Sequence, residues 1–354
     1  MRALYLLPTL LFLVPETATT IRFEPKADVS VTKTFTQKAD LEASAVEITL
    51  SGMEDDPAID LSMSWERSHA FTDTYLSSAD GKATKLRRKF GDLEHEIQGE
   101  LAVESMGFNG EESSHAAGES ALTGKAVTFT RDADDADAVE VAWVEGEGGP
   151  DELLEGLLVD TDLLGFLPTK DVAVGDSWDV PGDALVRLLV PGGASATELE
   201  SDGDEASLEM TIVGLNLVFL SQFEEIVGES QSCDATATFT GEREVDGVRM
   251  AVLKLDVELE TARDVSEVMR AFLENLDDED VTAELTGCDM TVALEATGEL
   301  LWNLDAGHVH GLDLKGDLRI EMERGVEVDA QGQEITVDLI LELEGELTLT
   351  LTVE

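Results

Sequence analysis

Apolar and polar residues alternate along the end of the chain, from Ile335 to Glu354. One parity is apolar from Val337 to Val353 except at Gly345, and the other carries Thr, Asp and Glu, with Ile340 as its apolar exception. Because successive side chains of a β-strand point to opposite faces, this pattern predicts one long strand with an apolar and a polar face. At about 3.3 Å per residue it would extend roughly 65 Å, unless Gly345 bends or bulges it.

Shorter segments with the same alternation precede this strand. They are Val29–Phe35, Val46–Leu50, Ala235–Phe239, Leu253–Leu259, Val292–Trp302 and Leu312–Met322. Asp80-Gly81, Asp246-Gly247 and Asp305-Ala306-Gly307 are typical of tight hairpin turns, because Asp and Gly tolerate positive φ angles. Strands joined by hairpins predict an antiparallel meander with one wet face. The polar, Gly-rich stretch from Gly99 to Ser120 is expected to be a loop.

Amphipathic helices are predicted beside these strands. Their segments are Asp151–Val159, Gly182–Val190, Leu215–Val227 and Asp264–Leu276, the last with Asp264 as its N-cap. A sheet with an apolar face needs a cover, which helices can supply. We therefore predict an α+β fold, in which a large twisted antiparallel sheet of long strands has its apolar face covered by roughly four helices.

The chain divides into three predicted parts. Residues 1–20 form a signal peptide, residues 21–191 a β-rich first half with short helices, and residues 192–354 a meander with two helices. The junction is expected near Gly192, in the turn Pro191-Gly192-Gly193. The two halves are expected to pack as one unit.

The signal peptide prediction depends on Met1 to Val14. Arg2 gives a minimal positive start, and the dozen apolar residues that follow are too few to span a bilayer. Ala18 suits a cleavage site, although Glu16 occupies a position where a small residue is preferred. We expect export to a periplasmic or extracellular location and no transmembrane segment.

The charge excludes some partners. The chain has 77 acidic and 23 basic residues, a formal net charge of −54. Nucleic acids and anionic membranes need clustered Lys and Arg, so neither is an expected partner. Self-repulsion on this scale is best tolerated in salty media or with condensed divalent cations, which predicts weak divalent cation binding. One basic patch interrupts the acid and is expected to pair with it: Lys82, Lys85, Arg87, Arg88 and Lys89.

Two cysteines, Cys233 and Cys288, lie near the starts of alternating segments. In an oxidising compartment they can join as a disulfide, which would stabilise the fold by roughly 4 kcal/mol in the chain-entropy model. Two separate buried thiols are the alternative, and the sequence leaves both open.

An esterase interpretation rests on Gly175-Asp176-Ser177 with Asp305 and His308, which superficially resembles lipases and esterases of the GDSL type. A nucleophilic Ser is usually seated on a strand-to-helix turn of a parallel sheet. Here Trp178 follows the Ser directly, and the strand–helix alternation of such folds is absent. We predict that the protein is not an enzyme.

Two places in the sequence offer possible metal ligands. His308 and His310 lie two apart with acids nearby, but zinc needs three or four placed ligands. The turn with Asp132, Asp134, Asp135, Asp137 and Glu140 offers oxygens to calcium but lacks the spacing of an EF-hand loop. A hairpin tip and a solvated acidic turn explain these residues as well, and we predict neither a metal site nor a cofactor.

Phe166-Leu167-Pro168 and the run from Val172 to Trp178 resemble a segment shared by uncharacterised secreted bacterial proteins, many from planctomycete-like organisms, with an "LP…VxVGDSW" motif. The segment from Gly298 to Gly307 is similar to another of theirs. The resemblance implies a secreted or envelope β-rich protein and no catalytic residues. Gly175, Asp176 and Trp178 have a structural interpretation: the Gly makes a turn, the Asp caps it, and the Trp plugs the end of the sheet.

Two functions follow as hypotheses. The first is an exported, non-enzymatic envelope protein that holds an apolar, lipid-like ligand against the sheet. The second is a structural or adhesive envelope protein whose acidic surface meets divalent cations or a protein partner. The sequence identifies no ligand-binding residues for either.

Overall fold

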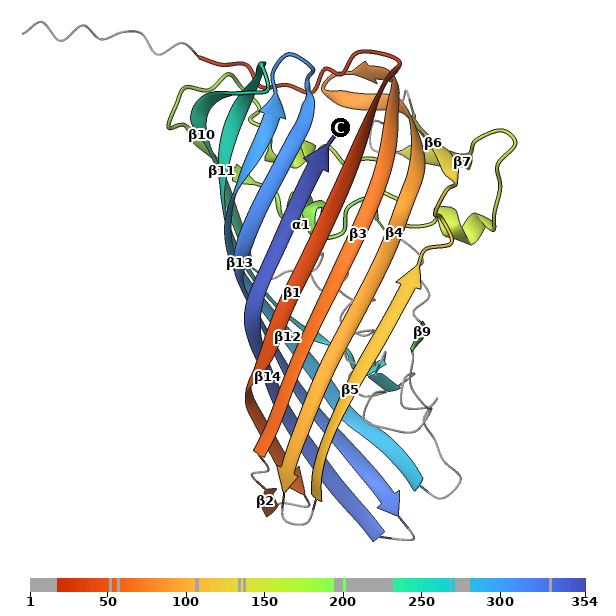
Figure 1. The fold of residues 1–354 in the computed structure, drawn as a ribbon, viewed down its shortest axis with the longest axis vertical. Coiled ribbons are helices and arrows are strands. Elements are labelled where there is room, and N and C mark those ends of the chain that lie inside the picture. The colour runs from red at the N-terminus through yellow and green to blue at the C-terminus, as the bar shows by residue number, and fades with distance from the viewer. Residues whose placement is uncertain are drawn as a thin grey trace, which may run out of the picture.

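A single antiparallel sheet dominates the computed structural model (Figure 1). The structure describes residues 18–50, 53–55, 58–105, 108–132, 135, 138–193, 200–201, 232–267, 269–270, 281–330 and 333–354. Its strands are β1 (Val29–Leu50), β2 (Met53–Asp55), β3 (Ala58–Ala79), β4 (Lys82–Ser105), β5 (Phe108–Glu119), β6 (Ala126–Arg131), β7 (Val139–Trp143), β8 (Ser177–Val180), β9 (Glu200–Ser201), β10 (Ser232–Val245), β11 (Val248–Asp264), β12 (Val281–Asn303), β13 (His308–Ala330) and β14 (Gln333–Val353).

The order across the sheet is β7-β6-β4-β3-β1-β14-β13-β12-β11-β10-β8. Neighbours are mostly hairpin partners, and β1 pairs with β14 so that the two halves of the chain share one sheet. β4 is long enough to pair with β6 near its start and with β5 near its end. The predicted meander is therefore confirmed.

The long terminal strand is confirmed as β14, and Gly345 neither bends nor bulges it. Gly345 lies opposite Leu41 of β1 and Leu318 of β13, and the register with both strands is regular at this position. The bulge between β1 and β14 is at Ser44 of β1. A Cβ on Gly345 would lie 1.9 Å from the carbonyl oxygen of Asp40. The glycine therefore permits close approach of two strands.

The predicted α+β class is wrong, because the described residues are mostly β-strand and the one α-helix described from end to end is the eight-residue α1 (Gly182–Leu189). The predicted helix from Asp151 to Val159 shortens to the 3₁₀ turn η1 (Asp151–Leu154), since Gly156 adopts a φ of 73° that ends helical geometry. A second 3₁₀ turn is η2 (Leu164–Phe166). None of the described helices has the length and apolar character that crossing a bilayer requires.

The other predicted helices are only partly described. Residues 215–227 lie outside the described residues. After Asp264, residues 266–267 and 269–270 are helical, and the carboxylate of Asp264 accepts the Ser266 N–H at 2.8 Å, as an N-cap does. Residues 271–276 lie outside the described part.

The predicted loop from Gly99 to Ser120 is also wrong. β4 continues to Ser105, and β5 pairs with it from Phe108 to Glu119. Backbone pairing with a long neighbour stabilises this polar segment as a strand, although its side chains show no clear alternation.

Strand alternation gives the sheet two distinct faces. The inner face carries buried side chains such as Phe35, Leu343 and Leu349, whereas the outer face carries polar ones such as Thr34 and Glu344. On the outer face, Lys315 and Arg319 of β13 contact the carboxylates of β14 at 2.6 to 3.7 Å, which offsets the like charges there. Residues 145–193, called here the covering segment, lie in the upper half of Figure 1 and pack on the inner face there.

Candidate functional site

A cluster of fully buried charges lies between the inner face and the covering segment. Lys33 comes from β1, Asp73 from β3 and Arg88 from β4, and each has a relative exposure of 0%. Thr161 and Asp162 come from the covering segment, at 1% and 5%. In an interior of low dielectric, such charges are tolerated only when they are paired and hydrogen-bonded.

The pairing is complete at the centre of the cluster. Lys33 Nζ lies 3.1 Å from Asp73 Oδ2 and 2.9 Å from Asp162 Oδ2, and it donates to Thr161 Oγ1 at 2.9 Å. Arg88 donates from Nε and Nη2 to the two oxygens of Asp73 at 2.7 and 3.0 Å. Two cations thus face two carboxylates, and all three N–H groups of the Lys33 ammonium are engaged.

The protonation states in this cluster are fixed by their surroundings. Burial by itself would raise the pKa of Asp73, but the charges of Arg88 and Lys33 outweigh it and hold that pKa well below its usual range. Burial and the carboxylates of Asp162 and Asp73 raise the pKa of Tyr75 well above 10. Tyr75 therefore stays protonated and donates its hydroxyl to both oxygens of Asp162, at 2.8 and 2.7 Å.

The same cluster holds the backbone of the covering segment. Arg88 donates from Nη1 to the carbonyl of Leu158 at 2.7 Å and from Nη2 to that of Val159 at 3.0 Å. Asp160 accepts the N–H groups of Asp162 and Leu164 at 2.9 and 3.1 Å. Strands β1, β3 and β4 are thereby tied to one loop, and the geometry is that of a structural latch.

A second polar contact under the covering segment joins His69 of β3 to His95 of β4. Their Nε2 atoms are 2.8 Å apart and the ring centroids 5.1 Å apart, so the rings meet end to end. His69 Nδ1 lies 3.4 Å from the carbonyl of Pro191. A carbonyl only accepts, so Nδ1 carries the proton and His69 Nε2 accepts from His95.

Both rings of this pair are neutral. Burial, reinforced by the positive charge of Arg67 and by His95, lowers the pKa of His69 well below 6.5. Burial and Arg67 lower the pKa of His95 to about 3. No sequence motif marks these two histidines. The Asp80-Gly81 hairpin aligns β3 with β4 so that His69 lies opposite Leu93 and His95 opposite Arg67, which makes the two rings diagonal neighbours on the inner face.

The residues of the GDSL-like interpretation are not brought together. Ser177 lies on β8, bonded to Thr238 at 2.8 Å, whereas His308 lies on β13, beyond β10, β11 and β12. Asp305 pairs with Arg249 at 3.1 Å. The described residues therefore contain no Ser–His–Asp arrangement from this set.

The VGDSW motif forms a joint between the covering segment and the sheet. Gly175 has a φ of 93°, and Asp176 accepts the Ala173 N–H at 2.8 Å. Trp178 pairs with Ala237 of β10 and donates its ring N–H to the Phe166 carbonyl at 3.1 Å. Gly175 thus lies in a turn that the Asp176 carboxylate caps, and Trp178 is half-buried on the edge strand β8.

Cys233 and Cys288 are both free thiols. Cys233 lies on β10 and Cys288 on β12, with β11 between them, and Cys233 is level with Leu259 and Leu294 rather than with Cys288. Burial raises the pKa of the Cys288 thiol to about 11, which keeps it protonated. The disulfide alternative is not formed in this structure.

The two places with possible metal ligands, around His308 and in the acidic turn, hold no metal-binding cluster among the described residues. Within the described ranges no group of three or more His, Cys, Asp or Glu side chains could hold a metal ion. His308 instead stacks on Tyr75, with ring centroids 6.5 Å apart. In the acidic turn, Asp134 and Asp137 lie outside the described residues.

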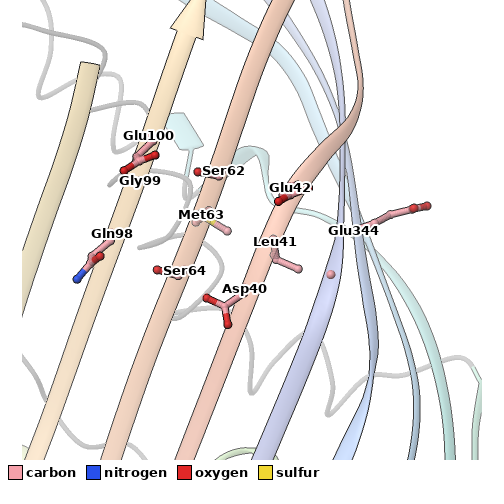
Figure 2. A pocket seen from close by; sticks show the side chains of 11 residues that line it. Asp40, Leu41, Glu42, Ser62, Met63, Ser64, Gln98, Gly99, Glu100 and Glu344 are labelled. Atoms are coloured by element: carbon pink, nitrogen blue, oxygen red, sulfur yellow. The ribbon is translucent and has the colours of Figure 1, made fainter. Parts of the chain in front are cut away.

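Two hollows are present among the described residues. One, of about 470 Å³, crosses β14, β1, β3 and β4 at mid-length, and Figure 2 shows its lining. Its exposed side chains are Asp40, Glu42, Gln98, Glu100 and Glu344. The other, of about 800 Å³, lies between residues 21–24, the Asp80-Gly81 turn and residues 164–171. The lining of the first hollow also includes Leu41 and Met63, and that of the second includes Ile21 and Phe23, so both linings mix polar and apolar residues.

Comparisons with known proteins give no family. No family model matches the chain, and no curated protein matches it. Among solved structures, the outer membrane protein OprG from Pseudomonas aeruginosa aligns over 91% of this chain and 97% of that chain, at 6% identity and a TM-score of 0.22. OccK7 (OpdD) of Pseudomonas aeruginosa aligns over 91% and 98% at 7% identity and a TM-score of 0.15. A variant porin of Rh. blastica aligns over 91% and 100% at 10% identity and a TM-score of 0.12. Similarities of this size carry no argument about function.

Proposed function

We propose that this chain is an exported, non-enzymatic protein of the cell envelope that holds an apolar, lipid-like ligand against the inner face of its sheet. The observation that carries the proposal is the length of the apolar inner face. Strands of more than 20 residues, such as β12 and β13, keep apolar side chains on this face far beyond the level of the charge cluster.

The lower part of the inner face has the composition of an adaptable apolar surface. Its side chains are Leu41, Met63, Ile97, Met290, Ile320, Met322, Leu341 and Leu343. Methionine has a flexible, polarisable side chain that packs against irregular shapes, as an acyl chain requires. The charge cluster and the histidine pair lie near the other end, where they tie down the covering segment.

The outer face offers little apolar surface to such a ligand. Among the described residues only Val29 and Val174 are large exposed apolar side chains, at 36% and 56%. The outer positions of β11 to β14 are rich in charged residues, and such a face is stable in contact with water. An apolar ligand would therefore be held inside.

Extraction of the purified protein tests this proposal. Protein exported by living cells is extracted with organic solvent. Mass spectrometry of the extract then gives the amount of apolar molecule per mole of protein. We expect an apolar molecule in near-stoichiometric amount, and saturable uptake of a fluorescent fatty acid after its removal. Absence of both would end the proposal.

Adjacent residues on β13 supply a matched pair for the uptake assay. Met322 is on the inner face, with 1% exposure, and Glu323 is exposed on the outer face. Met322→Gln is expected to weaken uptake, whereas Glu323→Gln leaves it unchanged. Thermal melts of both variants show whether each is folded. Equal uptake by the two folded variants would contradict binding on the inner face.

The second candidate function uses the acidic outer surface. The hollow of Figure 2 gathers Asp40, Glu42, Glu100 and Glu344 near one another, which favours diffuse association with divalent cations or a cationic protein. Light scattering during calcium titration tests it. Assembly that calcium induces and chelation reverses would support this candidate, and indifference to calcium would count against it.

A further inference from the structure

Three exposed cations on the outer face of β4 have no acidic partner. The side chains of Lys85, Arg87 and Lys89 are exposed and make no ion pair or hydrogen bond with the residues that the structure describes. Other outer-face lysines differ, because Lys38 and Lys315 each lie 2.6 Å from a carboxylate oxygen. The sequence-based expectation that the basic patch pairs with acid is confirmed for Arg88, which points inward and pairs with Asp73.

The cross-strand neighbours of these three cations are mostly hydroxyl residues, at positions from which acidic side chains could have paired with the cations. On β3 the residues opposite Lys85, Arg87 and Lys89 are Ser77, Thr74 and Thr72. On β6 they are Thr130, Thr128 and Ala126. Residues two apart on a strand are about 7 Å apart, so the three cations form a straight row roughly 14 Å long.

The acid-free area continues across the next two strands. Thr32, Thr34 and Thr36 of β1 follow Thr72 and its neighbours, and Thr34 and Thr36 lie opposite Thr352 and Thr350 of β14. We call this area the hydroxyl–cation face. Its members are Ser30, Thr32, Thr34, Thr36, Thr72, Ser77, Lys85, Arg87, Lys89, Thr128, Thr130, Thr348, Thr350 and Thr352. Thr74 lies among them but is buried, at 8% exposure, and bonds to Ser30 at 2.8 Å.

Acids appear only at the rim of this face. Asp92 follows the row on β4, Glu140 lies on β7, Asp313 on β13 and Glu354 at the chain end beside Thr32. Glu147 lies at the β6 edge, where its carboxylate accepts the N–H of Ala126 opposite Lys89. In a chain with 77 acidic residues, a surface of five neighbouring strands without one is a marked departure from the composition. A row of like charges without counter-charges is also unfavourable by itself.

The chemistry of the face defines its partner. Cations bind carboxylate, sulfate or phosphate groups, and flanking hydroxyls donate to and accept from the hydroxyls of a sugar. Five strands at about 4.8 Å give a width of roughly 20 Å, somewhat more than two Debye lengths of about 8 Å at physiological salt. A narrow chain lying within the face is thus screened from the surrounding acid, whereas a broad anionic surface meets the net charge of −54.

We propose that the hydroxyl–cation face binds an extended anionic glycan, with Lys85, Arg87 and Lys89 contacting its charged groups and the threonines of β3, β6 and β1 its hydroxyls. This site lies on the opposite side of the sheet from the inner face and does not depend on the lipid-like ligand.

Binding of the full exported chain to immobilised dextran sulfate tests the proposal, with neutral dextran as the reference. We expect retention on dextran sulfate alone, with affinity that falls with salt at a log–log slope of about −2, as three contacts to a single chain predict. The triple variant Lys85→Ser, Arg87→Ser and Lys89→Ser is expected to bind at least about tenfold more weakly. The control variant Arg243→Ser, Arg249→Ser and Lys254→Ser makes the same change of charge at ion-paired sites on β10 and β11, away from the face, and its affinity should change less than about twofold.

The outcomes that would overturn the proposal are specific. Equal losses in the two triple variants would show a general charge effect, and an unchanged affinity in the first variant would place binding elsewhere. Binding to vesicles of anionic phospholipid but not to dextran sulfate would assign the face to a membrane. Self-association of the wild type that the first variant loses, without glycan binding, would assign it to a second copy of the chain. Fatty-acid uptake by the same variant is expected to remain at the wild-type level, which separates this test from that of the proposed function.

Discussion

Arg88 and its neighbours Arg87 and Lys89 share a strand and a charge but have opposite surroundings. Arg88 is fully buried and bonded to Asp73, Thr161 and two backbone carbonyls. Arg87 and Lys89 are exposed and face hydroxyls. The comparison teaches that strand parity places neighbouring basic residues on opposite faces, and that the partners on each face decide whether a cation is paired or left exposed.

The largest effect is expected from breaking the latch. Arg88→Met leaves the carboxylate of Asp73 buried without its bidentate partner, which costs about 3–5 kcal/mol of unfolding free energy. Arg87→Met, one residue away on the outer face, should change that energy by less than about 0.5 kcal/mol. Urea denaturation of both variants checks this. Similar losses for the two would mean that the buried pairing is not what distinguishes them.

Acid should loosen the contact between the histidine pair and the covering segment. Both pKa values are lower in the folded chain than the ordinary value of 6.5. The unfolded chain therefore binds protons first, and the pair's contribution is intact above pH 6.5 and is lost as the pH falls toward about 3. At pH 5 the loss from His95, whose pKa is lowered from 6.5 to about 3, is about 2 kcal/mol.

Stability measured from pH 7.5 to 4.5 tests this loss. The double variant His69→Gln and His95→Gln should depend less on pH than the wild type, because it has no buried rings to charge. His115→Gln, at a more exposed position, serves as the control and should follow the wild-type profile. Parallel profiles for wild type and double variant would refute the assignment.

Tyr75→Phe should have an intermediate effect on the latch. It removes the hydroxyl that donates to both oxygens of Asp162, a buried hydrogen bond to a charged group worth about 1.5–3 kcal/mol. Hydrogen exchange should also show faster exchange at residues 158–164, while β14 remains protected. A variant as stable as the wild type would show that Lys33 alone satisfies Asp162.

The smallest effect on stability is expected from the outer row. Replacing Lys85, Arg87 and Lys89 together by Ser removes no ion pair to a described residue, so the unfolding free energy should change by less than about 1 kcal/mol while glycan binding is lost. Thermal melts beside the dextran sulfate assay check this. A large destabilisation would show that the row has a structural role.

Much of the sheet was predictable from local pattern. The alternation from Ile335 to Glu354 and the Asp-Gly dipeptides at 80–81 and 246–247 gave β14 and two hairpins, whose turn residues have the positive φ angles that the dipeptides favour. The helix predicted from Asp151 was wrong because the spacing of the leucines does not reveal that Gly156 adopts a left-handed conformation, which a helix cannot continue through. The loop prediction for 99–120 failed because pairing with β4 is a long-range effect.

The candidate sites depended on information that no local pattern contains. Lys33, Asp73 and Asp162 are separated by 40 and 89 residues along the chain, and nothing around any one of them marks it as buried. The histidine pair becomes visible only when β3 and β4 are aligned about their hairpin.

The sequence by itself determined the long antiparallel strands, their two faces and the unusual net charge, because alternation and composition act residue by residue. Only the tertiary structure decided which cations are buried in ion pairs and which are exposed to solvent. The physical reason is register: pairing β4 with β3 and β6 sets Arg88 against Asp73 and the outer row against hydroxyls, and a shift by one residue would exchange the two.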